Sequence, residues 1–172
     1  MARKWLPYQT FWGSSIPPNS RAINNTRVLG VWFSVAVPGV LVGMKYYPGA
    51  GDVPARNALV AFDLLGNVVA VARPRLTAAI VGGGPWQTAY FHPLYRMVAG
   101  GKVQICLATR AGLLFQTTGG LAGGAVTNGN ITALAPAASP NAVNGALGVV
   151  LAPPTSADGS NLHGVDLVFL AD

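Results

Sequence analysis

The sequence predicts an all-β fold, more specifically an antiparallel, jelly-roll-like β-sandwich with an N-terminal arm. Apolar residues recur at alternate positions in many segments, whereas the 3.6-residue period of a helix is nearly absent. Gly and Pro contribute 22 and 13 of the 172 residues and divide these segments into short runs. Residues 111–157 carry no charged side chain and are rich in Gly, Ala, Asn, Thr, Ser and Pro, a composition typical of short strands and tight turns.

The clearest predicted strand is the segment 28–37. Its odd-numbered residues from Leu29 to Val37 are all apolar, and they share one face of an extended chain. Val28 and Trp32 on the other face are apolar as well. This arrangement indicates a strand that packs on both sides.

The remaining strands are predicted between Gly-rich and Pro-rich turns. In chain order they are 40–47, 58–63, 68–72, 86–92, 102–109, 113–117, 131–134, 148–151 and 165–170. The strands 58–63 and 68–72 flank a short turn in which Gly66 supplies a positive φ, so they are expected to form a hairpin. Gly30 and Gly43 lie inside strands and indicate positions at which another segment approaches the backbone closely.

The length predicts one domain, because a chain of 172 residues can bury about 70% of the surface that its unfolded form exposes. We expect residues 1–25 to form an aromatic, Pro-containing arm and residues 26–172 to form the sandwich domain. No apolar run reaches the roughly 20 residues that a membrane-spanning helix needs. The basic N-terminus also lacks the apolar core of a signal peptide. The sequence therefore predicts no membrane insertion, no signal peptide and assembly in the cytoplasm.

The 11 basic residues outnumber the 5 acidic ones, but they are scattered along the chain. Nucleic-acid binding usually needs a concentrated basic stripe interleaved with aromatic rings. Only Arg73-Pro74-Arg75 approaches such a stripe. We therefore do not expect nucleic acid as a partner. The excess positive charge is expected to raise solubility or to meet acidic patches on a partner protein.

The residue types that carry catalysis are scarce and dispersed. The chain has no Glu and five Asp, and its two histidines, His92 and His163, are far apart in sequence. No Gly-x-Ser-x-Gly motif supports a catalytic triad, and the dispersed carboxylates do not suggest a glycosidase pair. Calcium needs more oxygen ligands than Asp52 and Asp63 supply, and Cys106 stands alone in an apolar run, as a buried hydrophobe does. We expect no enzyme activity, no cofactor and no metal site.

The N-terminal segment is rich in aromatic residues. Trp5, Tyr8, Phe11 and Trp12 lie within eight residues and lack strand periodicity, so their rings need an apolar surface to cover, on their own domain or on a neighbour. We predict them as interface residues. The uncharged segment 111–157 fits the same idea because interface cores are depleted of charge, and a set of Gly-rich sandwich loops explains it equally well.

Two further side chains have a predicted place in the fold. Trp86 follows three glycines and is expected to close the end of the sandwich rather than to stack on a sugar. Asp166 lies in the last strand, on the face opposite to Val165 and Leu167. It is expected either on a solvated face or held by a buried Arg or by backbone donors.

Six short motifs, taken together, resemble one known family. In chain order they are Leu29-Gly30-Val31-Trp32-Phe33, Gly39 to Tyr47, Gly66 to Ala70, Pro85-Trp86-Gln87, Ala99-Gly100-Gly101 and Gly164 to Phe169. Over roughly residues 10–170 the chain is similar to a β-sandwich family of uncharacterised function. That family occurs in secreted actinobacterial proteins, sometimes beside carbohydrate-active domains, and in minor tail proteins of phages that infect such bacteria. The long uncharged segment departs from the family, which tends to carry aromatic residues there.

The resemblance implies a structural virion protein of a bacteriophage, namely a minor tail or tail-tip protein located in the virion. Its expected partners are other copies of itself, other virion proteins and a glycan of the host envelope. A capsid decoration protein and a carbohydrate-binding β-sandwich module are the alternatives, and an esterase-like enzyme has the least support. For a glycan contact we predict Tyr46, Tyr47, Tyr90 and Tyr95, although Tyr46 and Tyr47 cannot both face one sugar from a regular strand.

Overall fold

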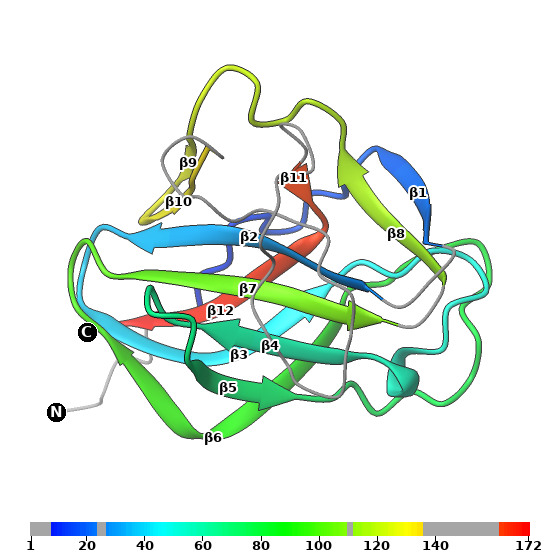
Figure 1. Ribbon diagram of the computed structural model, residues 1–172, viewed down its shortest axis with the longest axis horizontal. Helices are drawn as coiled ribbons and strands as arrows, with labels where there is room; N and C mark the ends of the chain where they lie inside the picture. The colour runs from blue at the N-terminus through cyan, green and yellow to red at the C-terminus, as the bar shows by residue number, and fades with distance from the viewer. Residues whose placement is uncertain (1–7, 24–26, 110–111, 136–161) are drawn as a thin grey trace, which may run out of the picture.

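The computed structural model describes residues 8–23, 27–109, 112–135 and 162–172, and in these ranges the protein is all-β (Figure 1). The one helical element there is a single 3-10 turn, η1 (Pro54–Arg56). The strands, in chain order, are β1 (Asn19–Ile23), β2 (Arg27–Val35), β3 (Gly39–Tyr46), β4 (Ala58–Phe62), β5 (Val68–Ala72), β6 (Gln87–Met97), β7 (Lys102–Thr109), β8 (Gly112–Thr117), β9 (Val126–Asn128), β10 (Ile131–Ala133), β11 (Leu162–His163) and β12 (Val165–Ala171).

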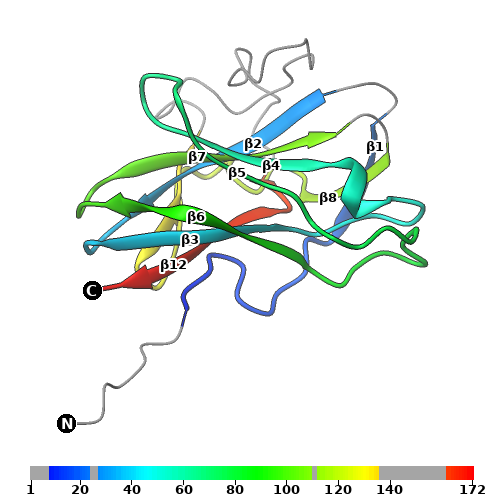
Figure 2. The same ribbon diagram turned by 90° about the horizontal axis from the view of Figure 1, so that it is seen from below.

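The strands form antiparallel sheets, which confirms the predicted all-β class. A six-stranded sheet has the order β5-β4-β7-β2-β10-β9, and a three-stranded sheet has the order β12-β3-β6. Figure 2 shows these two sheets as separate layers, with β2, β4, β5 and β7 above β3, β6 and β12. A second three-stranded sheet, β1-β8-β11, lies to one side. The arrangement is that of a β-sandwich.

The core lies between the two facing layers, and β2 shows why. Its residues Leu29, Val31 and Phe33 are fully buried in this core, as their period-two pattern predicts. The opposite face of the same strand is buried too, because Val28 and Trp32 are only 1% and 3% exposed. The prediction of a strand packed on both sides is confirmed, and a second apolar cluster on this outer face includes Val28, Ala58, Val60, Phe62, Cys106 and Ala108.

Two glycines permit close packing inside the sheets, as the sequence predicts. A Cβ atom on Gly30 would overlap the Sγ atom of Cys106 and would lie 2.7 Å from the carbonyl oxygen of Ile105. A Cβ atom on Gly43 would lie 2.9 Å from the ring of Tyr90. Only a residue without a side chain fits at these positions.

The described part of the N-terminal segment pairs and packs with the rest of the fold. Gln9 pairs with Phe169 at the edge of β12 through two backbone hydrogen bonds, and β1 pairs with β8 over its full length. Between these pairings the ring of Phe11 enters the main core and contacts Phe33 at 5.5 Å between centroids. The expected division into residues 1–25 and 26–172 therefore separates segments that share one core.

Most predicted strands are confirmed, including the β4–β5 hairpin with Gly66 at φ +81°. The strand expected at 86–92 continues to Met97 as β6, because a register shift opposite β3 lets its pairing continue. The short strands β1, β9 and β11 were not predicted: β1 and β11 pair with β8, which is distant in sequence, and β9 is a three-residue strand that pairs with its neighbour β10. The strand predicted at 148–151 lies outside the described residues. In the described ranges no helix is long and apolar enough to cross a membrane.

Candidate functional site

Asp166 anchors the N-terminal segment to the outer face of the β12-β3-β6 sheet. Its carboxylate accepts hydrogen bonds from the backbone N–H groups of Phe11 at 2.8 Å, Trp12 at 2.9 Å and Leu167 at 2.8 Å. The strand register places Lys45 opposite Asp166, and the Lys45 Nζ atom lies 3.4 Å from Asp166 Oδ2. Of the alternatives predicted for Asp166, backbone donors are found, and the cation beside them is Lys45 rather than an arginine.

Lys45, on the neighbouring strand β3, also binds the N-terminal segment. Its Nζ atom donates hydrogen bonds to Thr10 Oγ1 at 3.2 Å and to the carbonyl oxygen of Gly13 at 3.0 Å. The same atom lies 4.3 Å from the ring centroid of Trp86, a cation–π distance. One buried cation thus joins β3, β12, the N-terminal segment and the loop before β6.

Burial dominates the ionisation of this pair. Desolvation raises the pKa of Asp166 to about 6, against the opposing effects of Lys45 and of the three backbone donors. Desolvation also lowers the pKa of Lys45, and Asp166 acts against that shift. The ion pair therefore acts mainly by positioning the N-terminal segment and by supplying hydrogen bonds. Its net electrostatic contribution to stability is smaller.

The raised pKa of Asp166 predicts a pH dependence of stability. Folded Asp166 titrates near pH 6 and an unfolded aspartate near about pH 3.9, so between these values the folded state binds more protons. The contribution of Asp166 to the free energy of unfolding is therefore expected to be full below about pH 4 and to fall by about 2–3 kcal/mol as the pH rises to about 6.

Urea denaturation from pH 4 to pH 8 measures this effect as the difference between the wild type and Asp166→Asn. The two proteins differ only at this side chain, so the difference reports on Asp166. Parallel pH profiles for the two proteins would contradict the prediction.

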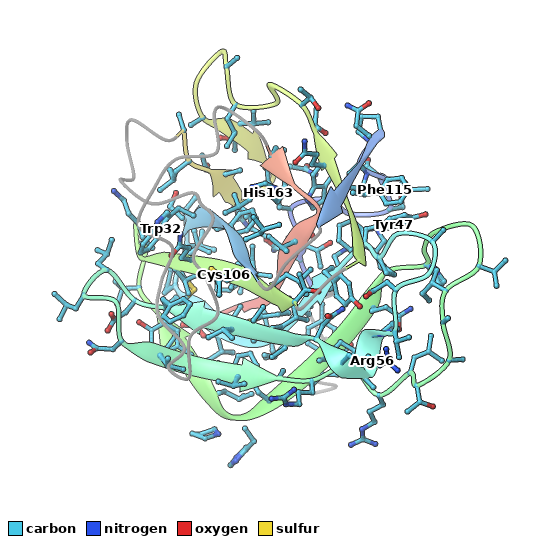
Figure 3. The ribbon with its side chains drawn as sticks, turned by 45° about the vertical axis from the view of Figure 1, so that its right-hand side comes forward. Trp32, Tyr47, Arg56, Cys106, Phe115 and His163 are labelled. Carbon is cyan, nitrogen blue, oxygen red and sulfur yellow. The ribbon has the colours of Figure 1, made fainter. Side chains whose placement is uncertain are left out.

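An aromatic cluster closes one end of the sandwich. The ring of Trp86 packs against Trp12 at 6.2 Å and Tyr47 at 5.4 Å between centroids, and Tyr47 packs edge-on against Phe115 at 5.1 Å. Figure 3 shows Tyr47 and Phe115 next to each other at this end. Trp86 also donates its indole N–H to the carbonyl oxygen of Ser15. Trp86 is half-buried against the main core, which confirms its predicted role in closing the sandwich.

The predicted interface residues do not share one environment. Phe11 and Trp12 are buried, at 5% and 8% exposure, in the core of their own domain. Of the two surfaces expected for these rings, their own domain covers Phe11 and Trp12, and an intermolecular role for the segment stays a prediction. Tyr8 is 58% exposed. Trp5 lies outside the described residues.

The four tyrosines predicted for a glycan contact are also dispersed. Tyr46 has no exposed surface, and its hydroxyl donates a 2.6 Å hydrogen bond to Asp52, so it cannot contact a glycan. This burial, together with the bond to Asp52, raises the pKa of the Tyr46 hydroxyl. Tyr47 belongs to the aromatic cluster, and Tyr95 is half-buried against the core. Tyr90 is 63% exposed, and its ring lies 6.4 Å from that of Tyr8.

The two histidines lie in different sheets. His92 is exposed on β6, whereas His163 is fully buried in β11 (Figure 3). Among the residues that the structure describes, no three of His, Cys, Asp or Glu are grouped as the ligands of a metal ion would be.

Sequence reasoning missed an exposed apolar end of the sandwich. Leu64 and Leu65 in the β4–β5 turn are 65% and 86% exposed, and Val98 in the β6–β7 turn is 69% exposed. The two turns lie at the same end because β4 and β7 are antiparallel neighbours. Figure 1 shows both turns on the left, together with the β2–β3 turn. We call Leu64, Leu65 and Val98 the apolar end.

The turn that carries the two leucines is held by hydrogen bonds to Asp63. The Asp63 carboxylate accepts hydrogen bonds from the backbone N–H groups of Leu65 at 2.9 Å and Asn67 at 2.8 Å, and from the Asn67 side chain at 2.9 Å. The hydrogen bond from the Asn67 side chain is the main cause of a lowered pKa at Asp63. An Asp followed by Leu-Leu-Gly-Asn is the only sequence signal for this feature, and it predicts the turn rather than the exposure.

Comparison with known proteins leaves the chain without an assigned family. No family model matches it, and no curated protein matches it as a relative. The geometry described above and the resemblance noted from the six motifs therefore support the proposals that follow.

Proposed function

We propose that this chain is a structural virion protein of a bacteriophage, a minor tail or tail-tip protein that assembles with itself and with other virion proteins. The observation that carries the proposal is the apolar end, where two leucines stand on a hydrogen-bonded turn. The family resemblance supports the tail assignment, because similar sandwiches occur in minor tail proteins. Its location is the virion, and no catalytic role is proposed.

The proposed fold class is a jelly roll. The chain alternates between the two facing sheets, from β2 to β3, then to β4 and β5, then to β6 and then to β7. Such alternation between two antiparallel sheets is typical of jelly-roll and Greek-key sandwiches.

Exposed leucines on a hydrogen-bonded turn suit a docking contact. Burying a leucine side chain is worth about 1.5–3 kcal/mol. A loop already held in one conformation loses little entropy on binding, so more of this gain is kept as affinity. Protein partners with an apolar pocket are therefore the proposed ligands of the apolar end.

Serine substitution of both leucines is expected to weaken self-association at least tenfold. The double variant Leu64→Ser, Leu65→Ser removes the apolar contact without touching the Asp63 hydrogen bonds. Light scattering coupled to size-exclusion chromatography and sedimentation equilibrium measure the association. Val81→Ser is the matched control, since Val81 is 94% exposed in the loop that joins β5 to β6. A monomeric wild type, or equal weakening by both variants, would argue against assembly through this end.

Membership of the virion is tested on particles. An antibody raised against the chain is expected to label phage particles at the tail in immunogold electron microscopy. Label on the capsid would indicate a decoration protein instead, and absence of the chain from purified particles would overturn the virion proposal.

A carbohydrate-binding module is the second candidate, and the exposed pair of Tyr8 and Tyr90 favours it. The exposed ring of Tyr90 lies close to the backbone of Gly43, its partner on β3, and a sugar ring can stack on such an exposed aromatic face. A glycan array tests it, with Tyr90→Ala expected to abolish any signal and half-buried Tyr95→Phe expected to preserve it. An array without any signal removes this candidate.

A further inference from the structure

Three arginines form a basic patch at the end of the sandwich opposite to the apolar end. Arg73 and Arg75 follow β5, and the residue between them, Pro74, is buried. In an extended chain alternate residues face the same side about 7 Å apart, so a buried Pro74 leaves Arg73 and Arg75 facing solvent together. Both are exposed.

The fold adds Arg56 to these two residues from a distant part of the sequence. The backbone N–H of Ala55 donates a 2.9 Å hydrogen bond to the carbonyl oxygen of Leu76. This bond holds η1 beside Leu76, so the backbone of Arg56, the last residue of η1, lies close to that of Arg75. Arg56 is exposed, and Figure 3 shows it on the outside of the fold. We call Arg56, Arg73 and Arg75 the arginine patch.

The ion pairs between described side chains are those of Lys45 with Asp166 and of Arg96 with Asp172, and neither involves the arginine patch. Each described aspartate is engaged elsewhere, and the fifth, Asp158, lies outside the described ranges. The engaged pairs are Asp52 with Tyr46 and Asn57, Asp63 with Leu65 and Asn67, Asp166 with Lys45, and Asp172 with Arg96. The chain has no Glu and a net charge of +6. The positive charge of the patch is therefore available to an external anion.

We propose that the arginine patch binds a phosphodiester polymer through its backbone. Guanidinium groups form bidentate hydrogen bonds with phosphate oxygens, and all three cations of the patch are arginines rather than lysines. The cation–π contact of the described residues is that of Lys45 with Trp86, so it involves none of the three arginines of the patch. Recognition by charge and phosphate geometry is the mode that such a patch supports.

Two kinds of polymer carry a phosphodiester backbone, and the phosphodiester that they share is the proposed ligand. One source is single-stranded nucleic acid, and the other is a glycerol-phosphate polymer of a bacterial cell wall. An acidic protein surface is less well matched, because specific protein interfaces need a desolvated apolar centre beside their charges. The inference is independent of the apolar end and of the assembly proposed there.

The test is a titration of the full chain with three fluorescent probes at 50 mM and 200 mM salt. The probes are a 20-nucleotide single-stranded DNA, a glycerol-phosphate polymer and poly-aspartate. The double variant Arg73→Gln, Arg75→Gln is expected to lose at least tenfold in affinity for the phosphodiester probes. Its salt slope should also fall by about 1.4, since each neutralised phosphate contributes about 0.7 on a single strand.

The matched control is the double variant Arg96→Gln, Lys102→Gln. It also removes two positive charges, but near the apolar end. It is expected to change affinity less than twofold, because those charges do not belong to the patch. Binding to either phosphodiester probe that depends on Arg73 and Arg75 supports the proposal and identifies the source. Equal losses in the two double variants, tighter binding to poly-aspartate, or no binding at 50 mM salt would overturn it.

Discussion

Replacing Asp166 with alanine is expected to lower the free energy of unfolding by about 3–5 kcal/mol. The substitution leaves the buried Lys45 ammonium without its counter-ion and the backbone N–H groups of Phe11 and Trp12 without an acceptor. Removing one partner of a buried ion pair has a cost of this size, because the remaining charge is not solvated. Unsatisfied buried N–H groups add about 1–3 kcal/mol each where they remain dry. Urea denaturation followed by tryptophan fluorescence measures the loss.

Asp172→Ala is the matched control, because it removes the other aspartate ion pair of the described residues. The Arg96–Asp172 pair is solvent-exposed, so its loss is expected to cost about 0–1 kcal/mol. Asp166→Asn is expected to fall between the two alanine variants, since an amide keeps one acceptor oxygen. A loss below about 1 kcal/mol for Asp166→Ala would show that the N-terminal segment is not held by this carboxylate.

Replacing Phe11 with alanine is expected to destabilise the protein by about 3–5 kcal/mol. The Phe11 ring fills part of the main core and contacts Phe33 and Trp12. Removing a buried phenyl group costs the transfer free energy of the ring and leaves a cavity. Thermal and urea denaturation of the isolated protein measure the effect.

Tyr8→Ala is the comparison within the same aromatic segment. Tyr8 is largely exposed and contacts only the ring of Tyr90 among the described aromatic pairs, so its loss is expected to stay within about 0.5 kcal/mol. The opposite pattern, with Phe11→Ala folding normally and Tyr8→Ala failing to fold, would mean that the segment docks differently. A Phe11→Ala variant that keeps its stability but loses self-association would restore the interface role first predicted for Phe11.

Local patterns were enough to predict the strands whose burial follows from their own sequence. The alternation along β2 and the Gly66 turn of the β4–β5 hairpin are both signals within a few residues. The same holds for Gly30 and Gly43, whose position inside strands predicted that another segment approaches closely, and the structure shows Cys106 and Tyr90 there. These predictions succeeded because the sequence signal of each is local, even where the partner that makes the contact is distant.

The candidate sites could not be predicted in the same way. Trp12 and Tyr8 belong to one aromatic run, yet only the fold decides that the first is buried and the second is exposed. Arg56 is distant in sequence from Arg73 and Arg75, and one backbone hydrogen bond between η1 and residue 76 brings them together. Neither fact has a signature in composition or periodicity, because each depends on contacts between distant segments.

The sequence by itself determined an all-β chain with antiparallel strands, because period-two alternation and Gly and Pro turns act over short distances. Only the tertiary structure decided that residues 9–23 belong to the domain and that Asp166 holds them through Lys45 and two backbone donors. It also decided which leucines and arginines remain exposed. The physical reason is that burial and charge pairing belong to contacts made across the fold, and no single segment contains both partners.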